Sequence, residues 1–168
     1  MRTNDLSGSA VARLWLAAAA AALAAFGAIV FLLHPPAIHA AATSGAVVST
    51  SKTSLGTILV DSRGRTLYLF GKDTNGKSAC SGKCASFWPP LVTSGKPRVA
   101  GKAKVSLIGT IKRTDGRLQV TYKHHPLYRF AKDTGRGQTN GEGIDAFGAH
   151  WYVVSPAGNK IVKSGGGY

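Results

Sequence analysis

Acidic residues are scarce in this sequence of 168 residues. Seven Asp and Glu stand against 21 Lys and Arg, which gives a formal net charge of +14 and a pI near 10.3. So basic a chain is attracted to polyanions, although its charge does not identify one of them. With so few carboxylates no acid–base pair stands out, and Ser155 lacks the nucleophile elbow of a hydrolase. The composition and the length therefore argue against a large multidomain enzyme and against a hydrolase.

Long uncharged segments are also missing, except for one near the start of the chain. Residues 14–33 carry no charge over twenty positions, then two prolines follow, and residues 40–42 are small alanines that suit a signal peptidase. A secretory signal needs about 7 to 15 apolar residues, whereas about 20 can span a bilayer. Residues 1–42 are therefore predicted to be a signal peptide or an N-terminal membrane anchor, and both alternatives place the remaining chain outside the cytoplasm.

The rest of the chain lacks any amphipathic stretch of ten or more residues at helical spacing. Residues 43–53 are rich in Ser and Thr and predict a linker, with a short strand as an option at 46–49, and the glycine-rich residues 163–168 predict a flexible tail. Short apolar segments between turn residues predict an all-β domain over 54–162. The expected architecture is a small antiparallel sandwich or open barrel built from two hairpin repeats.

Three hairpins are expected from these apolar segments and the turn residues between them. The predicted hairpins pair residues 55–60 with 65–70, 118–123 with 126–130 across His124 and His125, and 151–155 with 159–162. A further strand is predicted over residues 105–112.

An internal repeat is the most specific feature of the sequence. Residues 68–74 (YLFGKDT) match residues 128–134 (YRFAKDT) at five of seven positions. A tryptophan follows each copy, fifteen residues after Asp73 in the first and eighteen after Asp133 in the second. This pattern predicts one supersecondary unit used twice, with repeat one over 54–92 and repeat two over 105–162, each covering the apolar face of the other.

Alternation along a strand predicts that the repeated Tyr and Phe face inward and that Leu69 and Arg129, which differ, face water. Asp73 and Asp133 follow the strand ends, where a carboxylate holds a turn by accepting backbone N–H bonds. The alternative is a ligand groove between the copies, which would also be the place for an enzyme's substrate. Its candidate residues are Tyr68, Phe70, Asp73, Trp88, Tyr128, Phe130, Asp133 and Trp151.

Taken with residues 80–84, 88–91, 110–116 and 150–156, these motifs resemble the bacterial secreted repeat of unknown function with a Y-x4-D motif, a family of predicted lipoproteins. The resemblance covers roughly residues 55–161. It implies a secreted or cell-envelope protein with tandem copies, and it carries no established activity. The sequence has no cysteine near residue 42, so the lipid attachment that the lipoprotein pattern implies is not expected here.

Only two cysteines are present, Cys80 and Cys84, and they are separated by three residues. Thiols outside the cytoplasm tend to oxidise, so a disulfide is the favoured interpretation, and it would mainly fix the loop that leads to Trp88. The alternative is a thiol pair that captures a soft metal such as Cu(I). Against it, the only methionine of the chain is Met1.

Metal ligands are otherwise poorly arranged. His124 and His125 are adjacent and would point to opposite faces of a strand, although a site of His125 with His150 and Asp133 stays open. Residues 133–145 hold carboxylates among glycines but match no EF-hand spacing, so a solvated loop is the favoured interpretation. No metal site and no cofactor are predicted.

Charge and compartment together give the functional hypothesis. Basic residues are spread along the chain and are densest over 96–104. We expect a non-enzymatic binding or structural module for anionic cell-envelope polymers or lipid head groups, which would also contact the membrane through residues 1–42 if they are retained. No reader of specific nucleic-acid sequences is indicated. The alternative is a small envelope protein that handles metal or redox chemistry through Cys80 and Cys84 with a nearby histidine.

Overall fold

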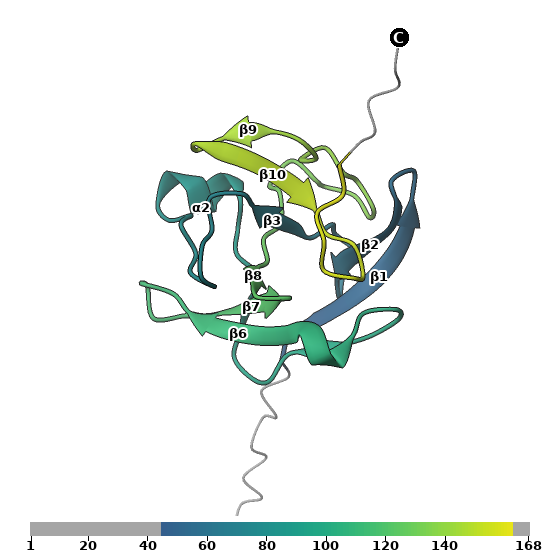
Figure 1. Cartoon of the computed structure of the whole chain (residues 1–168), viewed down its shortest axis with the longest axis horizontal. Coiled ribbons are helices and arrows are strands. Elements are labelled where there is room, and N and C mark those ends of the chain that lie inside the picture. The colour runs from purple at the N-terminus through teal and green to yellow at the C-terminus, as the bar shows by residue number, and fades with distance from the viewer. Residues whose placement is uncertain (1–44, 163–168) are drawn as a thin grey trace, which may run out of the picture. The chain divides into compact units, whose positions relative to one another are not determined.

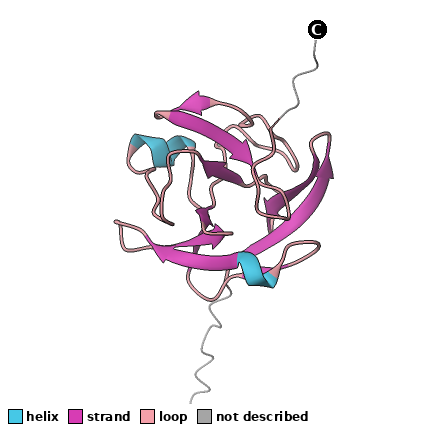
Figure 2. Ribbon diagram, in the orientation of Figure 1, coloured by secondary structure: helices cyan, strands magenta, loops and turns pink. Residues whose placement is uncertain are grey.

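Strands are the main regular structure of residues 45–162, which are the residues that this computed structural model describes. The all-β prediction is confirmed, whereas the predictions for residues 1–42 and 163–168 lie outside the described residues. Figures 1 and 2 show the strands together with the short helical turns, which are α2 and η2. The elements are β1 (Val47–Thr53), β2 (Gly56–Asp61), β3 (Tyr68–Phe70), α2 (Lys83–Phe87), β4 (Val92–Thr93), β5 (Arg98–Val99), η2 (Val105–Leu107), β6 (Ile108–Lys112), β7 (Leu118–Tyr122), β8 (His125–Pro126), β9 (Asp145–Ala146) and β10 (Ala149–Val153).

These strands form three small sheets. The orders are β2-β1-β5, β3-β10-β9 and β4-β7-β6, and β8 pairs with the free part of β7. Every pair is antiparallel except β1 with β5, which is parallel. In Figure 1 the sheet of β10 lies across the top of the domain and the sheet of β6 lies across the bottom. None of the sheets closes into a barrel within the described residues.

The domain begins earlier than the sequence predicted. Most of the expected linker, residues 43–53, is strand β1, which pairs with β2 from Val48 opposite Asp61 to Thr53 opposite Gly56. Val48 is fully buried. The Ser and Thr residues of β1 are half-buried along the sheet, where β-branched and hydroxyl side chains are well tolerated. The polar composition of this segment therefore predicted a linker, whereas pairing with β2 and β5 makes it strand β1.

The predicted hairpins form to different extents. The last one is present, because Val154 and Lys160 form a bridge and the N–H of Ser155 donates to the carbonyl of Asn159 at 2.9 Å. The middle one is present as β7 and β8, with its turn at Lys123 and His124, which both have positive φ. His125 therefore lies in β8 rather than in the turn.

The first predicted hairpin is only partly formed. The N–H of Asp61 donates to the carbonyl of Arg65 at 2.8 Å, and Gly64 has the positive φ that this turn requires. The chain then leaves this sheet, and β3 pairs with β10 instead. Residues 105–112 likewise begin as η2 before β6 starts.

The buried side chains form two clusters with β3 between them. Tyr68 and Phe70 lie in one cluster and Leu69 lies in the other, where it is 5% exposed. The prediction that Leu69 faces water is therefore wrong, because both faces of β3 are covered. Its counterpart Arg129 is half-buried, and its Nη1 lies 3.7 Å from the buried carboxylate of Asp61.

Candidate functional site

The two copies of the repeat meet at Tyr68 and Tyr128. The N–H of Tyr68 donates to the carbonyl of Tyr128 at 2.9 Å, and the N–H of Tyr128 donates to the carbonyl of Tyr68 at 3.0 Å. This reciprocal pair of backbone bonds is an antiparallel bridge that joins the two copies at equivalent residues. Equivalent residues of the repeat therefore lie near each other although sixty positions separate them.

Each tyrosine reaches the aspartate of the other copy. The Tyr68 hydroxyl donates to Asp133 Oδ2 at 2.5 Å, and the Tyr128 hydroxyl donates to Asp73 Oδ2 at 2.8 Å. Both tyrosine side chains and Asp133 are buried, whereas Asp73 is half-buried. The Y-x4-D motif is thus completed between copies rather than within one.

The second oxygen of each carboxylate holds a loop. Asp73 Oδ1 accepts the N–H of Ala79 at 2.8 Å, and Asp133 Oδ1 accepts the N–H of Asn140 at 3.0 Å. The Tyr68 hydroxyl also accepts the N–H of Gly141 at 3.2 Å. This is the turn-holding role that the strand-end position of the two aspartates indicates.

Four aromatic rings form a stacked column that also crosses between copies. Phe70 stacks on Trp151 with centroids 4.1 Å apart, Trp151 stacks on Trp88 at 3.9 Å, and Trp88 stacks on Phe130 at 4.3 Å. Each phenylalanine therefore packs on the tryptophan of the other copy. Such stacking adds to the burial of large apolar area, so each copy contributes half of a shared core.

Burial sets the protonation of the motif. Removal from water raises the pKa of the Tyr68 and Tyr128 hydroxyls, and the neighbouring carboxylates raise it further, so both tyrosines remain donors. Burial also raises the pKa of Asp133. It raises the pKa of Asp73 from 3.8 to about 6, although bonds from Ala79 and Tyr128 and the nearby charge of Arg113 act in the opposite direction.

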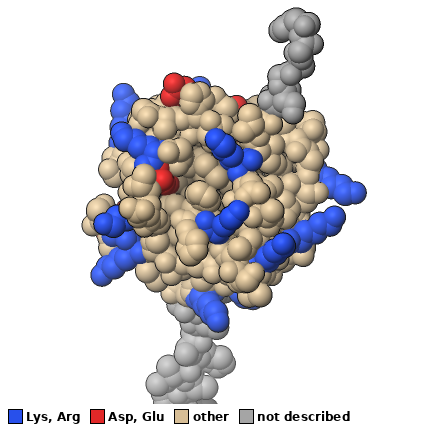
Figure 3. Space-filling model, viewed as in Figure 1, with Lys and Arg blue, Asp and Glu red and all other residues tan. Residues whose placement is uncertain are grey.

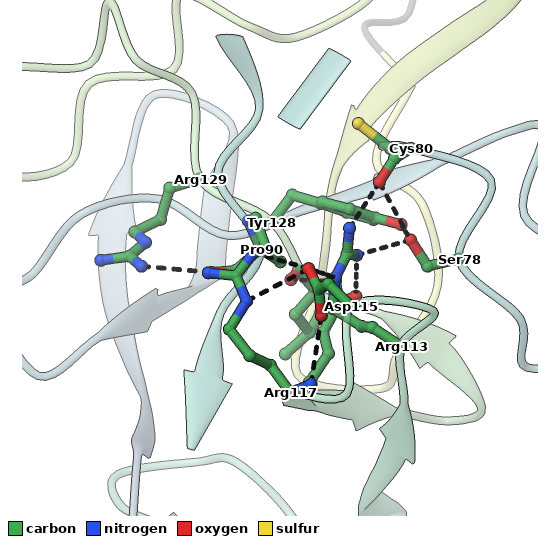
Figure 4. A network of polar contacts seen from close by, with 10 residues as sticks. Ser78, Cys80, Pro90, Arg113, Asp115, Arg117, Tyr128 and Arg129 are labelled. Atoms are coloured by element: carbon green, nitrogen blue, oxygen red, sulfur yellow. Dashed lines mark hydrogen bonds and ion pairs between the residues drawn. The ribbon is translucent and has the colours of Figure 1, made fainter. Parts of the chain in front are cut away.

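A buried guanidinium supports the Asp73 side of the motif (Figure 4). Arg113 Nη1 donates to Ser78 Oγ at 2.7 Å and to Gln119 Oε1 at 2.6 Å, and Nη2 donates to the carbonyl of Cys80 at 2.7 Å. The hydroxyls of Ser78 and Tyr128 lie 2.8 Å apart. The network joins the loop after Asp73 to β7, and its central arginine was not singled out from the sequence, where it is one residue of the stretch 110–116.

The two cysteines form the predicted disulfide, with their Cα atoms 5.3 Å apart. Cys84 lies in α2, and its carbonyl accepts the N–H of Trp88 at 2.8 Å. The bridge therefore fixes the turn that leads into the aromatic column. Within residues 45–162, no three His, Cys, Asp or Glu side chains gather into a group that could hold a metal ion.

Two hollows adjoin beside this network and share Asn75 and Gly76. The smaller has a volume of about 360 Å³ and is lined by Asp73, His124 and His125. The larger, of about 690 Å³, is called the basic groove here. Its remaining lining residues are Lys77, Ser78, Ser81, Ile111, Lys112, Arg113 and Thr114.

The predicted site residues border cavities only in part. Asp73 lines the smaller hollow, and Trp88 and Phe130 line a separate one that is described below. Tyr68, Tyr128 and Trp151 are buried against their partners in the other copy. His125 lines the smaller hollow together with Asp73, and neither His150 nor Asp133 lines that hollow.

Acidic and basic side chains of the described residues differ in their surroundings. Five of the six carboxylates there accept hydrogen bonds from the domain itself: Asp61, Asp73, Asp115, Asp133 and Glu142. By contrast, fifteen of the eighteen basic residues are exposed, and Figure 3 shows Lys and Arg spread over the visible face. The exposed basic residues are Lys52, Arg63, Lys72, Lys77, Lys83, Lys96, Arg98, Lys102, Lys104, Lys112, Arg117, Lys123, Lys132, Arg136 and Lys160.

Comparison with known protein families identifies a match over two segments of the chain. Residues 49–92 and 109–155, together more than half of the chain, match a family described as a secreted repeat of unknown function. The first match begins within β1, so this strand belongs to the first copy. No curated protein and no solved structure matches. No helix among residues 45–162 is long and apolar enough to cross a membrane.

Proposed function

The chain belongs to the family of secreted repeats of unknown function, and from this premise we propose that its domain is a non-enzymatic module that binds anionic polymers of the cell envelope. The observation that carries the proposal is the difference in surroundings between the acidic and the basic side chains. Carboxylates serve as internal acceptors, whereas most lysines and arginines point to water. The surface field is therefore strongly positive, and such a field attracts polyanions over distances set by the salt concentration.

The basic groove offers a place for such a contact. Lys77 and Lys112 are exposed there, and the hydroxyls of Ser81 and Thr114 can add hydrogen bonds to phosphate or carboxylate oxygens. The buried Arg113 holds the loop behind them through Ser78. A groove with a fixed wall loses less conformational freedom on binding than exposed lysines on a mobile loop.

Binding of inorganic polyphosphate, followed by calorimetry over a range of salt concentrations, tests the proposal. We expect affinity that falls steeply as salt rises, because exposed charges are screened. The double variant Lys77→Gln/Lys112→Gln should weaken binding more than the control Lys52→Gln/Lys102→Gln, which removes the same charge elsewhere on the surface. Affinity that does not change with salt would contradict the proposal, and equal losses in both variants would contradict the role of the groove.

A further inference from the structure

A second surface of the domain is apolar rather than polar. Phe87, at the end of α2, is 41% exposed, and Phe147, between β9 and β10, is 38% exposed. Their ring centroids are 6.1 Å apart. They are the aromatic members of the exposed large hydrophobic residues in the described part of the chain, so the domain presents one aromatic pair to solvent.

The pair borders a hollow of about 410 Å³. Trp88 and Phe130, two rings of the buried column, also line it, together with Ile144 and Ala146. We call the surface formed by Phe87, Phe147 and this hollow the phenylalanine patch. Exposed apolar patches of this kind mark contact sites more often than isolated apolar residues do.

Phe147 occupies a backbone position that does not favour it. Its φ is 60°, and the next residue, Gly148, has a φ of 90°, in the two-residue turn that joins β9 to β10. Asn and Gly are the usual residues where both turn positions have positive φ, because a side chain with a bulky Cβ substituent is strained there. Neither local conformation nor complete burial explains a phenylalanine at this position, which points to a contact outside the domain.

Lysines surround the patch. Lys83 and Lys132 line the hollow, and Lys72 Nζ lies 3.5 Å from the carbonyl oxygen of Phe147. All three lysines are exposed, and they outnumber Asp145, the one carboxylate of β9. Aromatic rings with flanking lysines suit the surface of an anionic bilayer, where the rings lie at head-group depth and the ammonium groups meet lipid phosphates.

We propose that the phenylalanine patch docks on the surface of an anionic phospholipid bilayer, with Phe87 and Phe147 entering the head-group region and Lys72, Lys83 and Lys132 contacting phosphates. This goes beyond the polymer-binding function, because it adds an apolar contact at a different surface. The positive charge favours a bilayer over an apolar protein partner, since anionic lipid supplies both the charge and the apolar phase that the patch matches.

Hydrogen exchange of the full-length chain on vesicles tests the docking with a local readout. We expect slower amide exchange at residues 83–87 and 144–148 on vesicles of phosphatidylglycerol and phosphatidylcholine than on phosphatidylcholine alone. Because the readout is local, contacts that other parts of the chain make with the vesicles do not obscure it. Exchange at these residues that anionic vesicles leave unchanged would overturn the proposal. Slowing that grows with protein concentration without vesicles would also overturn it, since it indicates self-association.

Phe147→Asn is the decisive variant, because asparagine suits a positive φ and the fold should be at least as stable as the parent. Vesicle affinity, read from the exchange at 83–87 and 144–148 over a lipid titration, should fall about tenfold on loss of one inserted ring. The matched control Val105→Asn changes another exposed apolar residue and should leave these amides unaffected. Unchanged affinity in Phe147→Asn would overturn the docking.

The same variants separate this proposal from the polymer-binding function. Phe147→Asn should leave polyphosphate affinity unchanged, and Lys77→Gln/Lys112→Gln should leave vesicle-dependent exchange at the patch largely unchanged. Loss of polyphosphate binding in Phe147→Asn would overturn the separate role of the patch.

Discussion

Tyr68 and Tyr128 exchange backbone hydrogen bonds, with N–H to carbonyl distances of 2.9 and 3.0 Å. This contact between equivalent residues fixes how the two copies combine. It places each tyrosine hydroxyl beside the aspartate of the other copy and each phenylalanine on the tryptophan of the other copy. Because both the polar pairs and the stacked column cross between copies, we infer that neither copy has a complete core alone.

The buried Tyr68 hydroxyl should matter for stability. Tyr68→Phe removes the donor to Asp133 and the acceptor for Gly141, and leaves a buried carboxylate with one partner fewer. We expect a loss of about 1 to 3 kcal/mol in the free energy of unfolding. Chemical denaturation measures it, with Tyr152→Phe as a control at a half-buried tyrosine outside the motif. An equal loss in Tyr152→Phe would contradict a special role of the crossed pair.

The Tyr68→Phe effect can be assigned to its partner by a double-mutant cycle with Asp133→Ala. The two changes should be non-additive by roughly 1 kcal/mol, because they remove the same hydrogen bond. Additive losses would show that the two side chains do not stabilise the domain through each other.

Much of the fold follows from local patterns in the sequence. Short apolar segments predicted an all-β domain, and the turn residues located the turns of the last two hairpins within a residue, although β8 ends at Pro126 rather than at residue 130. The repeat identified Tyr68 and Asp73 but not their partners, since those partners depend on the distant contact to the second copy. Strand β1 was missed because its Ser and Thr residues look like a linker until β2 is beside them.

Other features depend on which surfaces the tertiary structure covers. Alternation assumes one face in water, and β3 has none, so Leu69 was misplaced. Arg113 lies near a turn, and only the loop of Ser78 and Cys80 folding over it makes it buried. Phe147 was not singled out from the sequence, because its exposure depends on how the turn between β9 and β10 is placed in the folded domain.

The stability of the domain should fall when the buried Arg113 is replaced by lysine, although this change keeps the positive charge. Arg113→Lys loses the forked geometry that reaches Ser78, Gln119 and the Cys80 carbonyl together, and leaves buried acceptors unsatisfied. We expect a loss of roughly 3 kcal/mol in the free energy of unfolding, measured by chemical denaturation. Arg98→Lys is the matched control at an exposed arginine of β5, where about 0.5 kcal/mol or less is expected. Comparable losses in the two variants would show that burial of the network contributes little.

The disulfide between Cys80 and Cys84 can be tested in solution by its effects on thiol reactivity and on stability. Native protein should show no reactive thiol from Cys80 or Cys84 until a reductant is added, and two afterwards. Replacing both by serine should cost about 2 kcal/mol, the chain-entropy value for so small a ring. Thiol titration and denaturation measure the two effects. Reactive thiols in the native exported protein would instead support the metal or redox alternative.

Asp73 should make stability depend on pH in a direction opposite to that of an ordinary ion-paired aspartate. Its pKa rises from 3.8 to about 6 in the folded domain, chiefly because of burial, so the folded state binds the proton more tightly than the unfolded chain does. Its contribution to stability is therefore complete below pH 4 and is lost as pH rises through 6. His125 lines the same hollow as Asp73, and burial lowers its pKa, so it also contributes to the pH dependence of stability.

A comparison with Asp73→Asn isolates this effect, because asparagine stays neutral while its side-chain oxygen can still accept from Ala79. The lowered pKa of His125 acts in the opposite sense, removing stability as pH falls below 6.5, and this contribution is largely shared by both proteins. Urea denaturation at pH 4, 5, 6 and 7 should show the parent losing about 1 to 2 kcal/mol relative to the variant as pH rises. A difference that stays constant over this range would mean that Asp73 keeps its ordinary pKa, and that the bonds from Ala79, Tyr128 and the charge of Arg113 fully offset its burial.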